Sequence, residues 1–526
     1  MKNIILLDCT LRDGGYVNNW NFGAEEIDFI VKKLTESKID LIELGYFTKT
    51  RKTTNDTTLY DDLEKLDKKL NNKNNIVMIN YGEADIDDIP AYSKIKNIYA
   101  IRVAFHKEKL DEAINFCKEL KEKGWRVFAQ PMVTMLYSNN ELKKLVEKVN
   151  NLLPEALYIV DSFGTMREKD VKSKYEIIDK YLEPSISLGF HSHNNLQLSY
   201  SNVISFIELG QKRKIYIDSS VYGMGRGAGN LNTELIIEYL NNYHKNYKEG
   251  PILEIIDECL KKEKEKKEWG YSIEYYLSAT YDCHPNYARF LIDLHTINIS
   301  DINEILKSIP NNKKGKFDEA YVKELYTALL NHNVKDLDDY KKINKLLKNK
   351  KVILLGSGKS VKTQKSKINK EITENTIIVS LNHLSDIFNT DYTFISNKRR
   401  FHEIENKTTN SKVMCTSNVV EKTDKVKIVF DYLNNLAKEY EINDNVLLIF
   451  LNILKKAEIK EVFLAGFDGY DAGGNNYYID RLSFNIINER ADRINREIKK
   501  YLNLYSKNIK INWITKSKYE GEIKWK

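Results

Sequence analysis

Short apolar runs alternate with longer charged stretches along the first half of the chain. The apolar runs are rich in Ile, Leu, Val and Phe, which is typical of strands buried on both faces of a parallel sheet. The charged stretches repeat their apolar residues with a helical period. The predicted strands are Ile4–Cys9, Leu41–Tyr46, Ile76–Asn80, Ala100–Phe105, Arg126–Pro131, Leu157–Asp161, Ser187–His191 and Lys214–Ser219. Helices are predicted between them, for example at Glu25–Ser37, Leu110–Lys123, Asn140–Asn150 and Asp170–Tyr181.

Eight strand–helix units predict an α/β fold of the TIM (β/α)₈ barrel type over residues 1–235. An open doubly wound sheet is the competing arrangement, but it usually has fewer strands and begins with a glycine-rich turn. The first turn here, Thr10–Gly15, is charged instead. We therefore expect the N-terminal domain to be a barrel.

The pattern changes twice after the predicted barrel. Residues 236–347 have a helical pattern and include a charge run, Lys261–Glu268, that indicates a solvated helix face. We expect these residues to form a helical extension. Residues 348–526 return to alternating strands and helices and predict a smaller α/β domain with an open sheet. Its predicted strands are Val352–Leu355, Ile377–Leu381, Tyr392–Ser396, Val413–Thr416, Lys427–Phe430, Val462–Ala465 and Ile509–Ile514.

The composition is that of a soluble protein with few special features. The 526 residues include 82 basic and 75 acidic side chains, a formal net charge of +7. This small excess does not require nucleic acid as a partner, although it suits an anionic substrate. The five cysteines include no CxxC pair, so we expect neither a zinc cluster nor disulfides. No apolar run is long enough for a signal peptide or a membrane span, and a cytoplasmic location is expected.

Polar residues that follow the predicted strands suggest a metal site. Residues two apart on a strand point the same way, so His191 and His193 can offer two imidazoles to one centre. Asp13, after the first strand, can add a carboxylate at the same rim of the barrel. The alternative is that the two histidines are unrelated polar residues of a loop. Such ligands suit a divalent cation; Mn²⁺ is favoured, and Mg²⁺, Co²⁺, Zn²⁺ and Fe²⁺ stay open.

Arg12 precedes this aspartate directly. A metal that binds a 2-oxo acid polarises its ketone, and a nearby guanidinium can stabilise the enolate oxygen that develops. The alternative for Arg12 and Asp13 is a surface ion pair of little energetic value. Because the pair follows a buried strand and precedes two glycines, we favour an interior position.

Four segments resemble the motifs of one superfamily, the DRE-TIM metallolyases. They are Leu7–Gly15, Val160–Gly164, Gly189–Asn195 and Ser220–Asn230. Residues 1–287 are most similar to the branch that contains the 4-hydroxy-2-oxovalerate aldolases. This resemblance implies that a pyruvate enolate is formed or consumed in a retro-aldol cleavage or the reverse condensation.

The resemblance also implies roles for individual residues. Asp13, His191 and His193 would ligate the metal, with Asn230 as a further ligand. Arg12 would stabilise the enolate, and Glu43, at the end of the second strand, would support this region.

One residue departs from the pattern of the pyruvate aldolases. Those enzymes carry a histidine as general base three residues after the metal aspartate, where this chain has Tyr16. A tyrosine with an ordinary pKa of about 10 is a poorer base at neutral pH. Either Tyr16 is tuned so that it acts as the base, or the base lies elsewhere, or the substrate differs. His284 of the helical extension is a candidate replacement, as are Tyr46 and Tyr287. A capping or packing role is the alternative for His284.

The smaller domain begins with a glycine turn, Gly356–Ser360. It is not a P-loop, because Ile353 stands where the first glycine is needed, and Val361 replaces the third glycine of a dinucleotide fingerprint. A strand, a tight turn and a helix start remain, and backbone N–H groups in such a turn can hold a phosphate. An ordinary strand–helix turn is the alternative.

Two other polar residues of this domain, Asn382 and Asp468, also follow predicted strands. The segments around them are similar to bacterial proteins of polysaccharide gene clusters that are distantly related to sialyltransferases. That resemblance implies contacts of Ser357, Asn382 and Asp468 with a nucleotide or a sugar.

These observations favour a bifunctional, homo-oligomeric protein. Its barrel would be a metal-dependent aldolase that acts on a small 2-oxo acid and an aldehyde. Its second domain would handle a phosphorylated or nucleotide-linked sugar for a surface polysaccharide. The alternatives are an acyl-CoA-dependent condensing synthase, although no thioester-binding signature is present, and a decayed barrel that serves as a scaffold or binding module.

Overall fold

The computed structural model consists of two compact units. The first comprises Met1–Arg289 and Leu306–Asp318, and the second Phe290–Ile305 and Glu319–Lys526. The structure describes residues 3–210, 212–243, 245–294, 296–330, 336–405, 411–419, 426–438, 442–471, 475–479 and 488–521. Within these ranges, no helix has both the length and the apolar composition needed to cross a bilayer.

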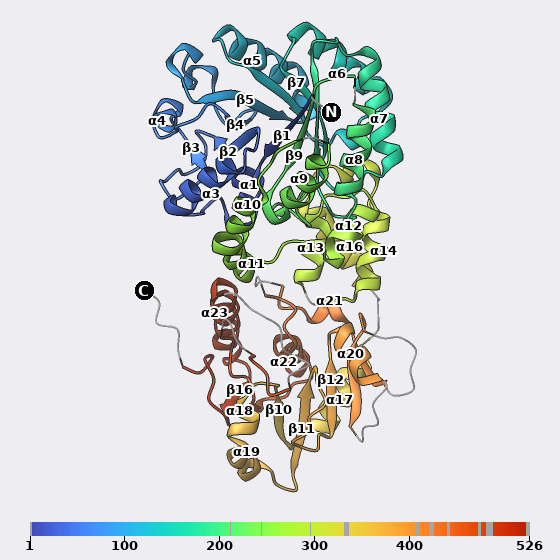
Figure 1. The fold of residues 1–526 in the computed structure, drawn as a ribbon. Helices are drawn as coiled ribbons and strands as arrows, with labels where there is room; N and C mark the ends of the chain where they lie inside the picture. Colours follow the sequence, from blue (N-terminus) through green and yellow to red (C-terminus); the bar gives the residue numbers. More distant parts are fainter. Residues whose placement is uncertain are drawn as a thin grey trace. The chain divides into compact units, whose positions relative to one another are not determined.

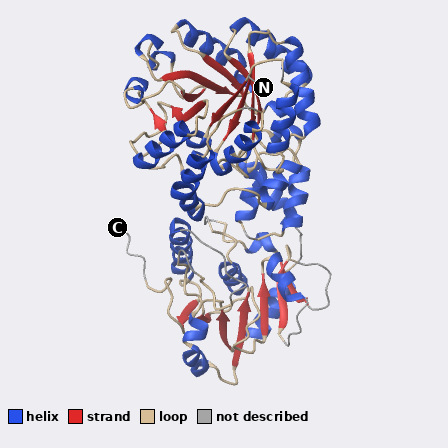
Figure 2. Ribbon diagram, in the orientation of Figure 1, coloured by secondary structure: helices blue, strands red, loops and turns tan. Residues whose placement is uncertain are grey.

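Eight parallel strands form the barrel of the first unit (Figures 1 and 2). They are β1 (Ile4–Asp8), β2 (Leu41–Phe47), β4 (Asn75–Asn80), β5 (Ile98–Phe105), β6 (Val127–Pro131), β7 (Ala156–Asp161), β8 (Ser187–Ser192) and β9 (Ile215–Ser219). Strand β1 pairs with β9 on one side and with β2 on the other, which closes the barrel. A two-residue strand, β3 (Leu59–Tyr60), lies beside β2. The predicted TIM barrel is confirmed.

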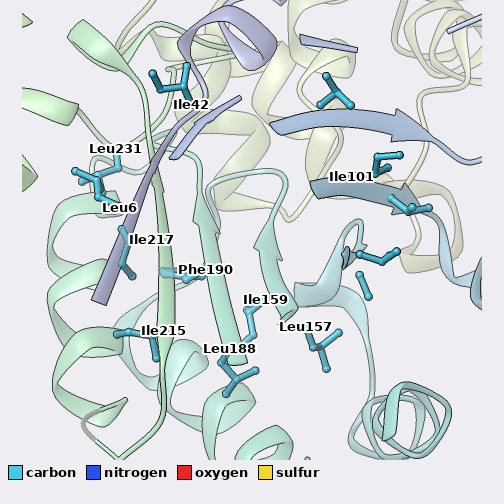
Figure 3. Close-up of a cluster of buried hydrophobic side chains, with 14 of the residues drawn as sticks. Leu6, Ile42, Ile101, Leu157, Ile159, Leu188, Phe190, Ile215, Ile217 and Leu231 are labelled. Atoms are coloured by element: carbon cyan, nitrogen blue, oxygen red, sulfur yellow. The ribbon is translucent and has the colours of Figure 1, made fainter. Parts of the chain in front are cut away.

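Helices cover the outside of the barrel. The main ones are α3 (Ala24–Glu36), α5 (Leu110–Glu122), α6 (Asn139–Leu152), α7 (Glu168–Tyr181), α8 (Ser199–Leu209) and α9 (Thr233–Asn241). The core between strands and helices uses every second strand residue, such as Leu188 and Phe190 of β8 and Ile215 and Ile217 of β9 (Figure 3). These side chains are buried, so the outward positions of the strands form the main hydrophobic core.

The inward positions of the strands change in character along the barrel. Near the amino ends of the strands, an apolar cluster fills the interior with residues such as Leu7, Phe128 and Tyr216. Further along, the inward positions are charged, as with Glu43 of β2 and Arg102 of β5. The barrel interior is therefore apolar toward the amino ends of the strands and charged toward their carboxyl ends.

Helices also make up the stretch that was predicted to be a helical extension. They are α10 (Glu249–Ile255), the π-helical η6 (Ile256–Leu260), α11 (Lys261–Lys266), α12 (Ile273–Thr280), α13 (Asn286–Asp293), α14 (Ile299–Ser308), α15 (Asn311–Lys314), α16 (Glu319–Leu330) and α17 (Leu337–Leu347). The boundary between the two units runs through α13 and α14. The lysine- and glutamate-rich α11 is largely exposed, as its charge run predicts.

The second unit contains an open parallel sheet of seven strands in the order β14-β13-β12-β11-β10-β15-β16. These strands are β10 (Lys351–Leu355), β11 (Thr376–Leu381), β12 (Tyr392–Ile395), β13 (Lys412–Thr416), β14 (Val426–Phe430), β15 (Glu461–Ala465) and β16 (Lys510–Trp513). Its helices are α18 (Ser360–Thr363), α19 (Lys365–Glu371), α20 (Lys398–Glu405), α21 (Tyr432–Asn435), α22 (Val446–Lys456) and α23 (Asn488–Tyr505). The predicted open sheet is confirmed.

Truncation of one outward-facing core residue tests the barrel packing. Leu188 is fully buried in the main core, so Leu188→Ala should lower the free energy of unfolding by about 2–5 kcal/mol. Leu253→Ala in α10 is the control; that side chain is 55% exposed, and its loss should change stability by less than about 0.5 kcal/mol. Urea unfolding followed by circular dichroism measures both. Equal midpoints for the two variants would contradict the packing described.

Candidate active site and metal centre

Three candidate ligands meet at the carboxyl rim of the barrel. Asp13 ends the helical turn α1 (Thr10–Asp13) that follows β1, His191 lies in β8, and His193 follows that strand. All three side chains are buried, and one ligand atom from each lies within 4.8 Å of the others. The structure thus brings together the carboxylate and the two imidazoles that the sequence pattern suggests.

Hydrogen bonds orient both imidazoles. Nδ1 of His191 lies 2.9 Å from Oδ2 of Asp218, and Nδ1 of His193 lies 3.1 Å from the carbonyl oxygen of Asp161. Both partners are acceptors, so each Nδ1 carries the proton and each Nε2 keeps a lone pair. Burial lowers the pKa of His191, which favours this neutral form. Two imidazoles whose Nδ1 contacts fix the direction of Nε2 are suitable ligands for a divalent cation.

The surroundings of the ligands also fit a bound cation. Nε2 of His193 and Oδ1 of Asn230 are buried without a hydrogen-bond partner among the described residues. The amide nitrogen of Asn230 donates to Oδ2 of Asp13 over 2.6 Å, which orients the carboxylate. Gly225 passes so close that a Cβ there would lie 2.7 Å from the same oxygen. The donor set of Asp13, His191, His193 and the Asn230 carbonyl is one that a divalent metal would satisfy.

Arg12 lies beside these ligands. Its Nε donates to Glu43 over 2.7 Å and its Nη1 to Asp13 over 2.6 Å, whereas its Nη2 is buried without a partner among the described residues. Burial disfavours the guanidinium charge, but the carboxylates of Glu43 and Asp13 outweigh it and hold the pKa of Arg12 above its ordinary value. Arg12 therefore stays charged and keeps one donor for a further acceptor.

A second buried arginine, Arg102 of β5, joins two parts of the site. Its guanidinium lies 3.1 Å from Glu43 and 2.5 Å from Asp218, and it stacks on the ring of Tyr158. The result is a chain of contacts from Arg12 through Glu43, Arg102 and Asp218 to His191. Burial raises the pKa of Asp218, but Arg102 and His191 outweigh this and lower it, so the carboxylate stays ionised.

Sequence reasoning missed Arg102 and Asp218. Each is a charged residue within an otherwise apolar strand, Ile98–Phe105 and Ile215–Ser219. A charge at an inward position of a buried strand requires a partner. That signal, a charge inside an apolar run, could have identified both residues.

The candidate bases lie close to one another. The hydroxyl of Tyr16 is 3.4 Å from that of Tyr46, and the guanidinium carbon of Arg226 lies 5.9 Å from the ring centre of Tyr16. Nη2 of Arg226 is 2.5 Å from Nε2 of His284. Burial, and next the charge of Arg226, lower the pKa of His284 to about 3, so this imidazole is neutral near pH 7. Tyr16 and His284 thus share Arg226 as a neighbour.

Tyr287 has different contacts. Its hydroxyl lies 2.9 Å from the carbonyl of Lys313 and 3.0 Å from that of Lys316. These contacts hold the helical extension together. They supply no reason to place Tyr287 among the groups that touch a substrate.

The three candidate residues of the second unit, Ser357, Asn382 and Asp468, line one cavity of about 1060 Å³. Oδ1 of Asn382 accepts a hydrogen bond from the backbone N–H of Ser396 over 2.9 Å. The carboxylate of Asp468 accepts hydrogen bonds from the backbone N–H and the hydroxyl of Ser360, at the start of α18. A carboxylate of the protein itself thus occupies the place that the glycine turn offers to a phosphate.

Comparisons with known proteins identify relatives of the first unit. Residues 3–250 match the family model described as HMGL-like. The 4-hydroxy-2-oxovalerate aldolase of Carboxydothermus hydrogenoformans is 29% identical over 244 residues, which cover 45% of this chain and 71% of that one. The enzyme of the same name from Geobacillus thermodenitrificans is 26% identical, over 46% and 70% of the two chains.

A solved structure also matches this part. It is the N-terminal domain of a candidate aldolase from Bacteroides vulgatus, which is 31% identical and has a TM-score of 0.48. The match covers 55% of this chain and 96% of that one. The family model and the two curated aldolases confirm the resemblance of the first unit to this aldolase branch.

The buried charge chain makes a stability prediction. Arg102→Leu leaves Glu43 and Asp218 without their shared cation, so it should lower the free energy of unfolding by about 3–5 kcal/mol. Lys148→Leu is the control because it removes an exposed ion pair with Asp111, which is worth about 1 kcal/mol at most. Denaturant unfolding of both variants gives the comparison. Similar losses in the two would mean that Arg102 does not balance the buried carboxylates.

Proposed function

We propose that this chain, whose residues 3–250 match the HMGL-like family model, is a divalent-metal-dependent aldolase that acts through a pyruvate-type enolate. The observation that carries the proposal is the set of Asp13, His191 and His193, with both Nε2 lone pairs fixed and Arg12 beside them. Relatives named 4-hydroxy-2-oxovalerate aldolase support this reaction class. The substrates would be a 2-oxo acid and an aldehyde.

The bound metal and Arg12 would have different roles in the reaction. A bound cation, with Mn²⁺ favoured, supplies Lewis acidity that polarises the ketone of a 2-oxo acid. Arg12 uses Nε and Nη1 to hold Glu43 and Asp13, and it keeps Nη2 to donate to the oxygen on which negative charge develops. Because the guanidinium is already held by two carboxylates, it needs no reorganisation when that charge appears.

Cleavage of an aldol also requires a group that takes the proton of the substrate hydroxyl. Of the candidate bases, Tyr16 and His284 lie next to Arg226. Burial raises the pKa of Tyr46, which makes it a poorer candidate. His284 is neutral, but its low pKa makes it a weak base, and its Nε2 already faces the guanidinium. We therefore assign proton transfer to Tyr16, whose phenolate form is the one that can take the proton. We assign to His284 the positioning of Arg226.

The second unit would act on a nucleotide-linked sugar, and the whole chain would contribute to synthesis of a surface polysaccharide as a homo-oligomer. Support for the first part comes from the cavity that Ser357, Asn382 and Asp468 share. In this arrangement the aldol product would be a sugar or a precursor of one.

Metal removal tests the aldolase proposal. The purified chain loaded with Mn²⁺ should release pyruvate from 4-hydroxy-2-oxo acids, and a chelator should abolish the release. His191→Ala should lower both the bound metal, measured by mass spectrometry, and the rate. His402→Ala in the second unit is the control and should change neither. Chelator-resistant pyruvate release, or full metal content in His191→Ala, would reject the proposal. No pyruvate release with any divalent metal would favour a decayed barrel.

Substitution of Arg12 separates charge stabilisation from metal binding. Arg12→Lys keeps the charge but loses the fork that spans Glu43 and Asp13, so kcat should fall by about 10²–10³. The bound metal should change much less. A variant with normal kcat would show that Arg12 does not act on the reacting oxygen.

The pH dependence of kcat distinguishes the two proton-transfer candidates. His284 has a pKa of about 3, so protonation of this imidazole occurs only far below neutral pH and should not shape the profile near pH 7. His284→Gln should therefore lower the rate without moving the profile, whereas Tyr16→Phe should lose most of the activity. If His284→Gln removes an acidic limb near neutral pH, the base is His284 instead.

A further inference from the structure

The large cavity of the second unit lies at the topological switch point of its sheet, where the order of the strands reverses. Strand β10 is paired with β11 on one side and with β15 on the other, and the chain runs outward from β10 through β11 to β14 before it returns to β15. The chain therefore leaves β10 toward one side of the sheet and β15 toward the other, and the topological switch point lies between these two strands. Open α/β sheets bind their ligands in the crevice outside the carboxyl ends of the strands at such a point.

The cavity walls come from the loops at that edge and from nearby helices. Gly356 and Gly358 follow β10, Asn382 follows β11 and Asn397 follows β12, and all of them line the cavity. A Cβ on Gly358 would lie 2.6 Å from the Asp468 carboxyl carbon, so these two loops press against each other. The volume of about 1060 Å³ lies at the upper end of the range for small-molecule sites. A ligand much larger than pyruvate can fit.

Charges on the cavity wall favour an anionic ligand. Four cations line it, and two of them are paired: Lys323 with Glu319, and Arg400 with Glu403. The other two, Arg399 of α20 and Arg493 of α23, pair with no carboxylate among the described residues. A guanidinium without a carboxylate partner at a cavity wall is suited to phosphate.

Two other carboxylates line the wall, Asp444 and Asp468, and neither forms an ion pair with Arg399 or Arg493 among the described residues. Asp468 is used to cap Ser360, whose backbone N–H donates to it over 2.8 Å. The glycine turn therefore does not present this N–H to a ligand. An anion in the cavity has to be held by the arginines.

The rest of the wall suits rings and hydroxyl groups. Tyr470 and Tyr477 lie edge to face, 6.4 Å between ring centres, and both line the cavity with Tyr519. Aromatic faces bind bases and the apolar faces of sugars. Asn382 and Asn397 add amides that recognise hydroxyl groups and base edges.

We propose that this cavity is a nucleotide site in which Arg399 and Arg493 bind phosphate and the tyrosines contact the base or an attached sugar. The inference deepens the proposed role of the second unit and names its ligand class and two arginines for it. It does not depend on the chemistry of the barrel.

Binding of UDP and CMP to the full-length protein, measured by isothermal titration calorimetry, tests the proposal. At least one nucleotide should bind, and Arg399→Gln and Arg493→Gln should each weaken its binding about ten-fold or more. Arg496→Gln is the matched control, because Arg496 is an exposed residue of the same helix as Arg493 and does not line the cavity. It should bind as the parent protein does. Arg399→Lys and Arg493→Lys replace the Gln variants if those do not fold, and they should weaken binding because lysine lacks the planar fork.

Inorganic phosphate and pyrophosphate separate a nucleotide site from a general anion site. Affinity for pyrophosphate equal to that for both nucleotides would overturn the nucleotide assignment. No binding of either nucleotide, or equal binding by the parent and both arginine variants, would overturn the site itself.

The barrel is tested separately in the same preparations. Arg399→Gln and Arg493→Gln should retain chelator-sensitive pyruvate release, and His191→Ala should retain nucleotide binding. A failure of the aldolase proposal would thus leave nucleotide binding intact, and a failure of the nucleotide site would leave pyruvate release intact.

Discussion

The first unit depends on a buried chain of alternating charges inside the barrel. It runs from Arg12 through Glu43, Arg102 and Asp218 to His191. Burial of any one of these charges alone would cost several kcal/mol, and its oppositely charged neighbours offset that cost. The chain therefore links the position of the Arg12 guanidinium to the orientation of His191, a candidate metal ligand. Strands β2, β5, β8 and β9, which carry its inner members, hold the relative positions of these groups.

The apolar cluster inside the barrel, below this charged layer, strengthens the interactions between the buried charges. Residues such as Leu7, Phe128 and Tyr158 fill the barrel below the charges and keep water from that side. Electrostatic interactions are stronger where water is excluded. Water on that side therefore does not weaken the electrostatic interactions of Arg12 and Asp13. The same strands thus carry a layer of apolar inward-facing residues and, further along, a layer of charged ones.

Most of the fold could be predicted from the sequence, because strands buried on both faces leave a clear apolar signal. The eight barrel strands and the seven strands of the open sheet lie within two residues of their predicted bounds. Asp13, His191 and His193 were identifiable because residue spacing on a strand and position at its end are local properties. Their approach to within 4.8 Å is a property of barrel closure.

The other site residues depend on contacts that a local pattern does not contain. Arg226 meets His284 across 58 positions of sequence, and Arg102 meets Asp218 across 116. Asp468 illustrates the same limit in the second unit, since its position after a strand suggests a ligand contact whereas its carboxylate caps Ser360. A spacing rule finds groups on one strand, but only the folded chain shows which strands face each other.

His284 lies beyond residue 250, where the family match ends, yet it contacts Arg226 in the loop after β9. Phe163, in the loop after β7, also packs on its ring. Helices beyond the family match thereby contribute a side chain to the surroundings of the candidate active site, whereas the candidate metal ligands lie within the matched residues. A change in these helices can therefore alter the groups around Arg226 without altering the strands and turns that position Asp13, His191 and His193.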